Sequence, residues 1–179
     1  MYYFLVSSLP MLKRDEAPFY SLPAFMGLCA DWITEHEYSI LEKLELVPVS
    51  ISESGFSASS VAAEWYRWEI CLRNRIAKAR SGVLGRDAGA FMLEAEDEFT
   101  EIDKAVQEIF LLTDPLEREK ALDGIRWYKA EELEFGHDFD FAKLCVYKIK
   151  LMLREKWTER LKEKGVKNLN DIINNVYAE

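Results

Sequence analysis

DFDFAKLCVYKIKLMLREKWTERLKEK, residues 138–164, is the stretch that decides the fold of this chain. Apolar side chains recur in it at steps of three and four, which places them on one side of a helix with 3.6 residues per turn: Ala142, Cys145, Ile149, Met152, Leu153, Trp157 and Leu161. Asp138 or Asp140 can cap the first turn, and Gly165 can end the helix. The other side carries Lys and Arg, so the pattern predicts a basic surface beside a buried apolar stripe.

A second long helix is predicted over residues 59–81, where Gly82 would end it. Its apolar positions also follow the helical period: Val61, Trp65, Trp68, Leu72, Ile76 and Ala79. We expect the two long helices to pack against each other through large side chains from both stripes: Trp65, Trp68, Leu72, Ile149, Met152 and Trp157.

Local start signals predict two shorter helices before the second long one. Ser21 can cap a helix that runs from about Leu22 through Trp32, with a proline in its first turn. The segment TEHE, residues 34–37, has the spacing of a capping box and opens a helix with apolar residues inward: Ile40, Leu41 and Leu44. The serine-rich run at residues 50–60 then predicts a loop.

Further helices are predicted on the C-terminal side of residue 82. The glycine-containing segment 81–89 reads as a connector, and residues 96–112 as a helix. Asp114 and Pro115 give a cap followed by proline, which begins a helix that continues to Gly136. A last short turn after Asn168 or Asn170 would carry apolar residues: Ile172, Ile173 and Val176.

The start of the chain has a different character. Residues 1–8 are rich in aromatic and branched side chains, which favours an extended segment laid on the body. The remaining chain has almost no alternating pattern of period two. The predicted fold class is therefore all-α: one domain over residues 1–179, a bundle of six or seven helices with a short extended N-terminal segment.

Composition narrows the class of protein. The chain has 179 residues, 49% of them hydrophobic, which suffices for one sizeable core. Its net charge of −9 argues against nucleic-acid binding, which depends on a basic face. Three separated cysteines among apolar residues suit reduced thiols, and no run is long and apolar enough for a signal or a membrane span. We expect a cytoplasmic protein that meets a membrane at most through a partner.

The charges are spread unevenly along the chain. Residues 94–108 hold seven acids and one lysine, whereas residues 148–167 hold eight bases and three acids. Such polarity indicates segments that pair with each other or with a charged partner protein.

No residue set indicates a reaction, a metal or a cofactor. His137, Asp138, Asp140 and Cys145 carry metal-competent side chains, but a helix cap already accounts for the aspartates. The glycines of residues 81–89 lack the Lys-Ser/Thr of a phosphate loop. The prediction is a protein that is not an enzyme.

Polar groups inside the apolar helix around Trp68 are more informative. Glu69 and Arg73 lie one turn apart and Asn74 follows; they form either an ordinary surface pair beside the core stripe or a polar contact with a partner. An aromatic beside Arg is typical of an interface anchor. The predicted interface combines residues of both long helices: Trp65, Trp68, Glu69, Arg73, Asn74, Tyr147, Lys148, Lys150 and Arg154. The alternative is a small-ligand or enzymatic pocket around Glu69, Arg73 and Asn74.

Three stretches carry a resemblance to a known family: YYFLVSSLP (residues 2–10), WExxLRN (68–74) and YxIKLxLRxxW (147–157). They resemble uncharacterised bacterial proteins encoded with V/A-type ATPase genes. Those proteins are distantly similar to the all-helical ATPase component that sits between the central rotor stalk and the proteolipid ring of the membrane. The resemblance implies an all-helical accessory protein that binds rotor or stalk subunits of a V/A-type ATPase. Neither the identity of the partner nor the oligomeric state follows from it.

Overall fold

The computed structural model describes residues 2–48, 60–93 and 99–159, and the described residues are helical with no strand. Their seven α-helices are α1 (Tyr2–Ser8), α2 (Leu22–Ala30), α3 (Glu35–Lys43), α4 (Ser60–Leu84), α5 (Glu101–Phe110), α6 (Pro115–Glu134) and α7 (Phe141–Glu159), and a short 3-10 helix, η2, spans Gly89–Phe91. The predicted all-α class is confirmed. None of the described helices has the length and apolarity that crossing a membrane requires.

Some predicted features lie outside the described residues. They are nearly all of the serine-rich loop over residues 50–60, the first residues of the 96–112 helix, the end of the 138–164 helix with Gly165, and the last turn around residues 168–176.

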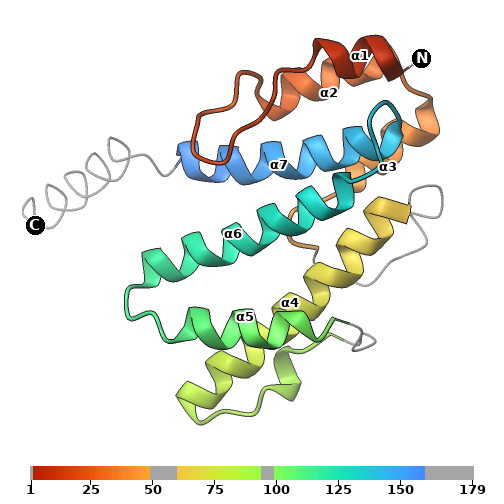
Figure 1. The fold of residues 1–179 in the computed structure, drawn as a ribbon. Coiled ribbons are helices and arrows are strands. Elements are labelled where there is room, and N and C mark those ends of the chain that lie inside the picture. The colour runs from red at the N-terminus through yellow and green to blue at the C-terminus, as the bar shows by residue number, and fades with distance from the viewer. Residues whose placement is uncertain (1, 49–59, 94–98, 160–179) are drawn as a thin grey trace, which may run out of the picture.

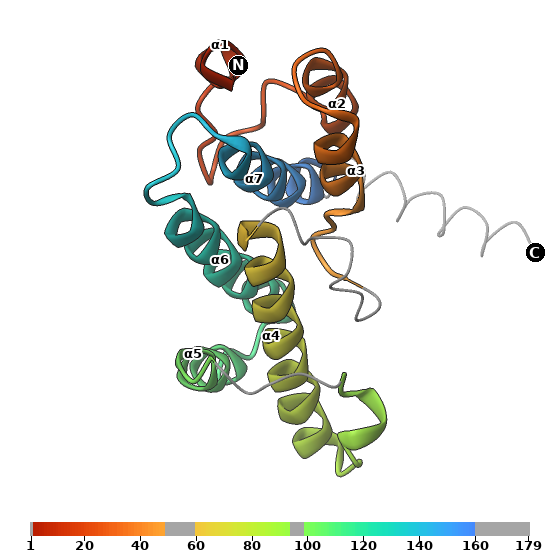
Figure 2. The same cartoon turned by 90° about the vertical axis from the view of Figure 1, so that its right-hand side faces the viewer.

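Helix α7 lies at the centre of the arrangement. It packs against α1, α2, α3, α4 and α6, while α5 packs against α4 and α6 at the far end (Figures 1 and 2). All eight residues from Leu144 to Leu151 are buried. A helix that is buried on all sides belongs to the core of a protein, so α7 is a central helix and not an amphipathic surface helix.

The predicted basic surface on this helix is therefore wrong for its first half. Lys148 is only 4% exposed and Lys150 only 7% exposed. Each ammonium group has a partner on a neighbouring helix. Lys148 Nζ donates to the backbone oxygens of Leu41 and Glu42 at the end of α3, and Lys150 Nζ pairs with Glu134 at the end of α6. The helical period identifies faces of a helix but does not say how many neighbours cover them.

The predicted extended segment at the N-terminus is also wrong, because residues 2–8 form helix α1. Leu5 is buried in the core, and Tyr2 and Val6 pack partly against it. Residues at this three- and four-residue spacing share one helix face, which α1 lays on α7. Strand propensity is a weak preference, and here tertiary packing overrides it.

The local cap signals are confirmed where the structure describes them. Thr34 forms the capping box of α3, with reciprocal bonds between Thr34 and Glu37. Asp114 Oδ1 accepts from the backbone N–H of Leu116 at 2.9 Å, at the start of α6.

The end of α4 differs from the prediction. Gly82 does not end this helix, which continues to Leu84, and Gly85 adopts a φ of 62°. The Arg86 N–H then bonds to the Ser81 oxygen at 3.0 Å. This helix-ending arrangement needs a left-handed residue and therefore favours glycine at position 85.

The predicted packing of the two long helices is confirmed in part. Trp65, Trp68 and Leu72 of α4 and Ile149 of α7 are buried, and α4 contacts α7. Met152 and Trp157 are only partly buried. The indole N–H of Trp157 donates to Asp123 of α6 at 2.9 Å, so this side chain packs on α6.

Trp65→Ala and Trp68→Ala should each lower the free energy of unfolding by about 3–5 kcal/mol, because each removes a large buried aromatic group. Trp157→Ala should cost clearly less, because that side chain is partly exposed. Chemical denaturation of the three variants measures the difference. Equal costs at Trp65 and Trp157 would contradict the assignment of the core.

Lys148 gives a prediction for pH. Burial lowers the pKa of Lys148 to about 8, and nearby acidic groups oppose this only weakly. Since the native pKa lies below the unfolded one, charging the buried group costs stability below pH 8, and this cost disappears as the pH rises toward 10.5. Between these values, the wild type should gain at most about 3 kcal/mol relative to Lys148→Met.

Denaturation of both proteins from pH 7 to pH 10.5 tests this pH dependence. The exposed Lys104 provides the control, since the difference between the wild type and Lys104→Met should stay nearly constant with pH. A constant difference for Lys148→Met as well would show that Lys148 is not perturbed in the native state.

Candidate functional site

The structure does not gather the predicted interface residues on a surface. Arg73 and Arg154 are half-buried, and the other seven are buried: Trp65, Trp68, Glu69, Asn74, Tyr147, Lys148 and Lys150. They lie inside because α4 and α7 form the centre of the bundle. This prediction is corrected, since the polar members of the set serve contacts within the domain.

Glu69 lies at the centre of a buried ionic network. Its side chain is 0% exposed, and its two oxygens accept from Arg126 of α6 at 2.6 and 2.9 Å. Arg126 also donates to Asp123 at 2.9 Å. Asp123 in turn accepts from Lys156 and Trp157 of α7, each at 2.9 Å. The network therefore joins α4, α6 and α7.

Burial governs the protonation of this network. Desolvation raises the pKa of Glu69, although Arg126 opposes the shift. Desolvation also acts to lower the pKa of Arg126, but Glu69 and Asp123 outweigh it and hold the pKa above its ordinary value. The guanidinium therefore stays charged between two carboxylates. The sequence placed Arg73 beside Glu69, but the bidentate partner is 57 residues away and no local pattern indicates it.

The alternative of a ligand pocket around Glu69, Arg73 and Asn74 is not formed either. Arg73 donates to the backbone oxygen of Pro48. The Asn74 side chain makes two bonds with the backbone of Leu93, at 2.8 and 2.9 Å. The three groups hold three different segments and do not converge on a common space.

Breaking the buried ion pair should destabilise the protein more than replacing it. Glu69→Leu alone should cost about 3–5 kcal/mol, because it removes the bidentate partner of a buried guanidinium. The double variant Glu69→Leu/Arg126→Met should recover part of that loss. Urea denaturation of the single and double variants measures the coupling. A double variant less stable than the single one would show that Arg126 is needed independently of Glu69.

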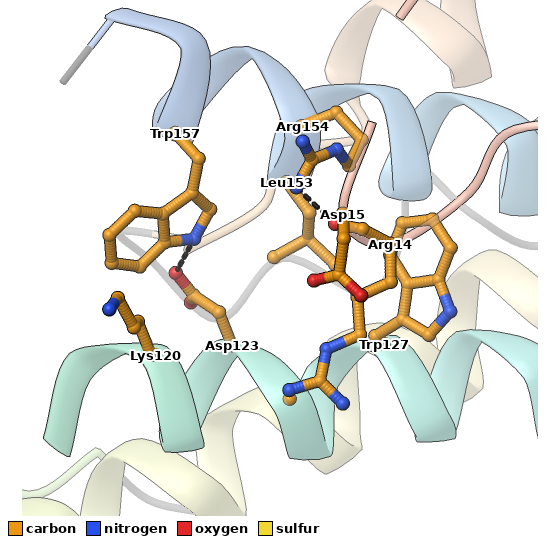
Figure 3. A pocket seen from close by; sticks show the side chains of 9 residues that line it. Arg14, Asp15, Lys120, Asp123, Trp127, Leu153, Arg154 and Trp157 are labelled. Atoms are coloured by element: carbon orange, nitrogen blue, oxygen red, sulfur yellow. Dashed lines mark hydrogen bonds between the residues drawn. The ribbon is translucent and has the colours of Figure 1, made fainter. Parts of the chain in front are cut away.

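A small cavity lies between α6, α7 and the segment that precedes α2 (Figure 3). It has a volume of about 220 Å³, and Trp127 and Trp157 stand on either side of it. Its lining residues are Arg14, Asp15, Lys120, Asp123, Gly124, Trp127, Leu153, Arg154 and Trp157.

Most polar groups of this cavity already have partners. Arg154 Nε donates to the Glu16 oxygen at 2.7 Å, and Lys120 pairs with Glu117 at 2.8 Å. The Arg14 guanidinium lies over the Tyr128 ring at 5.7 Å from its centroid. Gly124 leaves room for it, since a Cβ there would approach Arg14 Nη2 to 3.0 Å. The cavity is thus a seam where the N-terminal segment is fastened to α6 and α7.

A cluster of exposed aromatic rings is the most unusual surface feature of the described residues. Tyr3 is 57% exposed, Phe4 69%, Trp32 40% and Phe139 49%. Tyr3 contacts Phe4 and Phe139, with ring centroids 5.7 and 4.7 Å apart, and Phe4 lies 6.5 Å from Trp32. We call these four residues the aromatic face. They come from α1, from the turn between α2 and α3, and from the loop between α6 and α7, which meet at one end of the molecule in Figure 1.

The capping box of α3 fixes one side of this face. Tyr2 donates its hydroxyl to Glu37, whose other oxygen accepts from the backbone and hydroxyl of Thr34 at 2.9 and 2.8 Å. Desolvation would raise the pKa of Glu37, but the bonds from Tyr2 and Thr34 hold it below its ordinary value. Desolvation, followed by the bond to Glu37, raises the pKa of Tyr2 to about 12. Helix α1 is thus attached to the start of α3.

The loop between α6 and α7 fixes the other side. Gly136 turns the chain with a φ of 82°. His137 Nδ1 lies 2.6 Å from Asp140 Oδ2, and Asp140 Oδ1 accepts from the Lys143 N–H at 3.1 Å. This confirms that Asp140 caps the helix. Phe139 is held within this short hydrogen-bonded loop.

The sequence did not indicate the aromatic face. Tyr3 and Phe4 suggested a strand, and Trp32 was predicted to lie in the buried stripe of the first short helix, but α2 ends at Ala30. One signal was present, because each of the three segments places aromatic residues at a helix end or in a turn. Only the fold brings them together.

Comparison with known protein families places part of this chain in a described group. The family model described as "Protein of unknown function (DUF2764)" matches residues 81–179, more than half of the chain. Searches of the curated proteins and of the solved structures found no match.

Proposed function

The chain belongs to the DUF2764 family, whose description assigns no activity, and we propose that it is a non-catalytic interaction protein that binds another protein through the aromatic face. The observation that carries this proposal is the contact between four exposed rings from three separate segments. Contiguous apolar area on a protein surface marks an interaction site more often than scattered exposed residues do.

The rings have the properties of binding anchors. Tyrosine and tryptophan, with arginine, dominate the energetic centres of protein interfaces. The aromatic face is held by contacts within the domain, namely the Tyr2–Glu37 bond and the capped loop at Asp140. A surface that is ordered before binding loses less conformational entropy when the partner arrives.

We further propose that the partner is a rotor or stalk subunit of a V/A-type ATPase. Support for this step is the resemblance of residues 2–10, 68–74 and 147–157 to proteins encoded with those ATPase genes. The first of these stretches contains two of the four rings of the aromatic face. In this arrangement the protein would reach a membrane only through its partner.

Substituting the rings should abolish binding without unfolding the protein. Tyr3→Ser/Phe4→Ser should weaken binding to the ATPase partner at least tenfold, since hot-spot truncations cost about 2 kcal/mol or more. The melting temperature should change little, because both side chains are more than half exposed. Pull-down and binding kinetics against the purified central-stalk and ring subunits at low salt provide the measurement.

Phe91 gives a matched control. It is 64% exposed and lies in η2, away from the aromatic face, so Phe91→Ser should bind like the wild type. No binding of the wild type to any of these subunits would contradict the ATPase partner. Binding that persists in Tyr3→Ser/Phe4→Ser would contradict the role of the aromatic face.

A further inference from the structure

We infer that the partner segment bound by the aromatic face is basic, with apolar side chains flanked by Lys or Arg. This inference rests on the proposed function and specifies the chemistry of the partner. It follows from the charges around the four rings.

The segments that carry the rings are strongly acidic. Residues 2–8, 31–37 and 135–140 contain five acidic residues, neither Lys nor Arg, and both histidines of the chain. The acids are Asp31, Glu35, Glu37, Asp138 and Asp140. Three of them, Asp31, Glu35 and Asp138, are exposed. The Lys143 ammonium, at the start of α7, is already paired with Glu134 at 2.8 Å.

This acidic rim selects among partners by desolvation. A neutral or acidic segment that covers the rings would take these carboxylates out of water without giving them a partner, which costs free energy. Lys and Arg side chains would pair with the carboxylates, and a cation near an aromatic ring gains a further attraction. The same charges oppose a phosphate backbone or an anionic lipid surface. They also oppose a second copy of this chain, which carries a net charge of −9.

Two synthetic amphipathic peptides test the inference directly. Both have the same leucine positions; one carries lysine and the other glutamate at all remaining positions. Isothermal titration calorimetry should show that the full chain binds the lysine peptide at least tenfold more tightly. Raising the salt from about 0.05 to about 0.5 M should reduce this preference, because screening shortens the reach of the charges.

Matched variants separate the rim from the general negative charge of the chain. Asp31→Asn/Asp138→Asn should weaken binding of the lysine peptide several-fold. Glu101→Gln/Glu108→Gln removes the same number of exposed charges on α5, where the effect should be small. Tyr3→Ser/Phe4→Ser should also lose the lysine peptide.

The outcomes distinguish the inference from the proposed function. Equal affinity for the two peptides, or equal loss from both pairs of charge variants, overturns the basic partner while the role of the rings stands. If the rings instead cover a second copy, the wild type should sediment as a dimer and Tyr3→Ser/Phe4→Ser as a monomer, which also overturns the inference. Failure of the proposed function is read separately, from capture of the ATPase subunits.

Discussion

Burial of α7 on every side is the constraint on which the rest of the structure depends. A helix that carries Lys148 and Lys150 among apolar residues can occupy the centre only if each ammonium group meets a partner, because an unpaired buried charge is costly. The end of α3 supplies backbone oxygens to Lys148, and Glu134 at the end of α6 pairs with Lys150. The positions of both helix ends are therefore linked to the charges of α7.

The ionic network around Arg126 applies the same requirement at the next layer. Glu69 brings a carboxylate from α4 into the interior, and Arg126 from α6 satisfies both of its oxygens. Asp123 extends the chain of contacts to Lys156 and Trp157 of α7. Such a buried network tolerates little displacement, because each missing bond leaves a charged group unpaired. It fixes the relative positions of three helices that apolar packing alone would hold less specifically.

This internal use of charge changes where an interaction site is found. The Arg and Lys side chains that suggested a binding surface are largely engaged inside the domain, whereas the exposed aromatic rings lie where α1, the α2–α3 turn and the α6–α7 loop meet. The rings are held at this end by polar contacts of their neighbours, Tyr2 with Glu37 and Asp140 with the start of α7. An apolar centre with an acidic rim is thus built on supports that are themselves ordered.

The sequence by itself determined the helical class, most helix starts and the large apolar residues of the two long helices. These features depend on interactions within a few residues, such as the capping box at Thr34 and the cap at Asp114. Only the tertiary structure decided that residues 2–8 form a helix, that Lys148 and Lys150 are buried, and that Glu69 pairs with Arg126. Periodicity shows which residues share a face, but the number of neighbours on that face, and partners far away in the chain, depend on how the helices pack. The aromatic face has the same origin, because its rings touch in space although Tyr3 and Phe139 stand near opposite ends of the described chain.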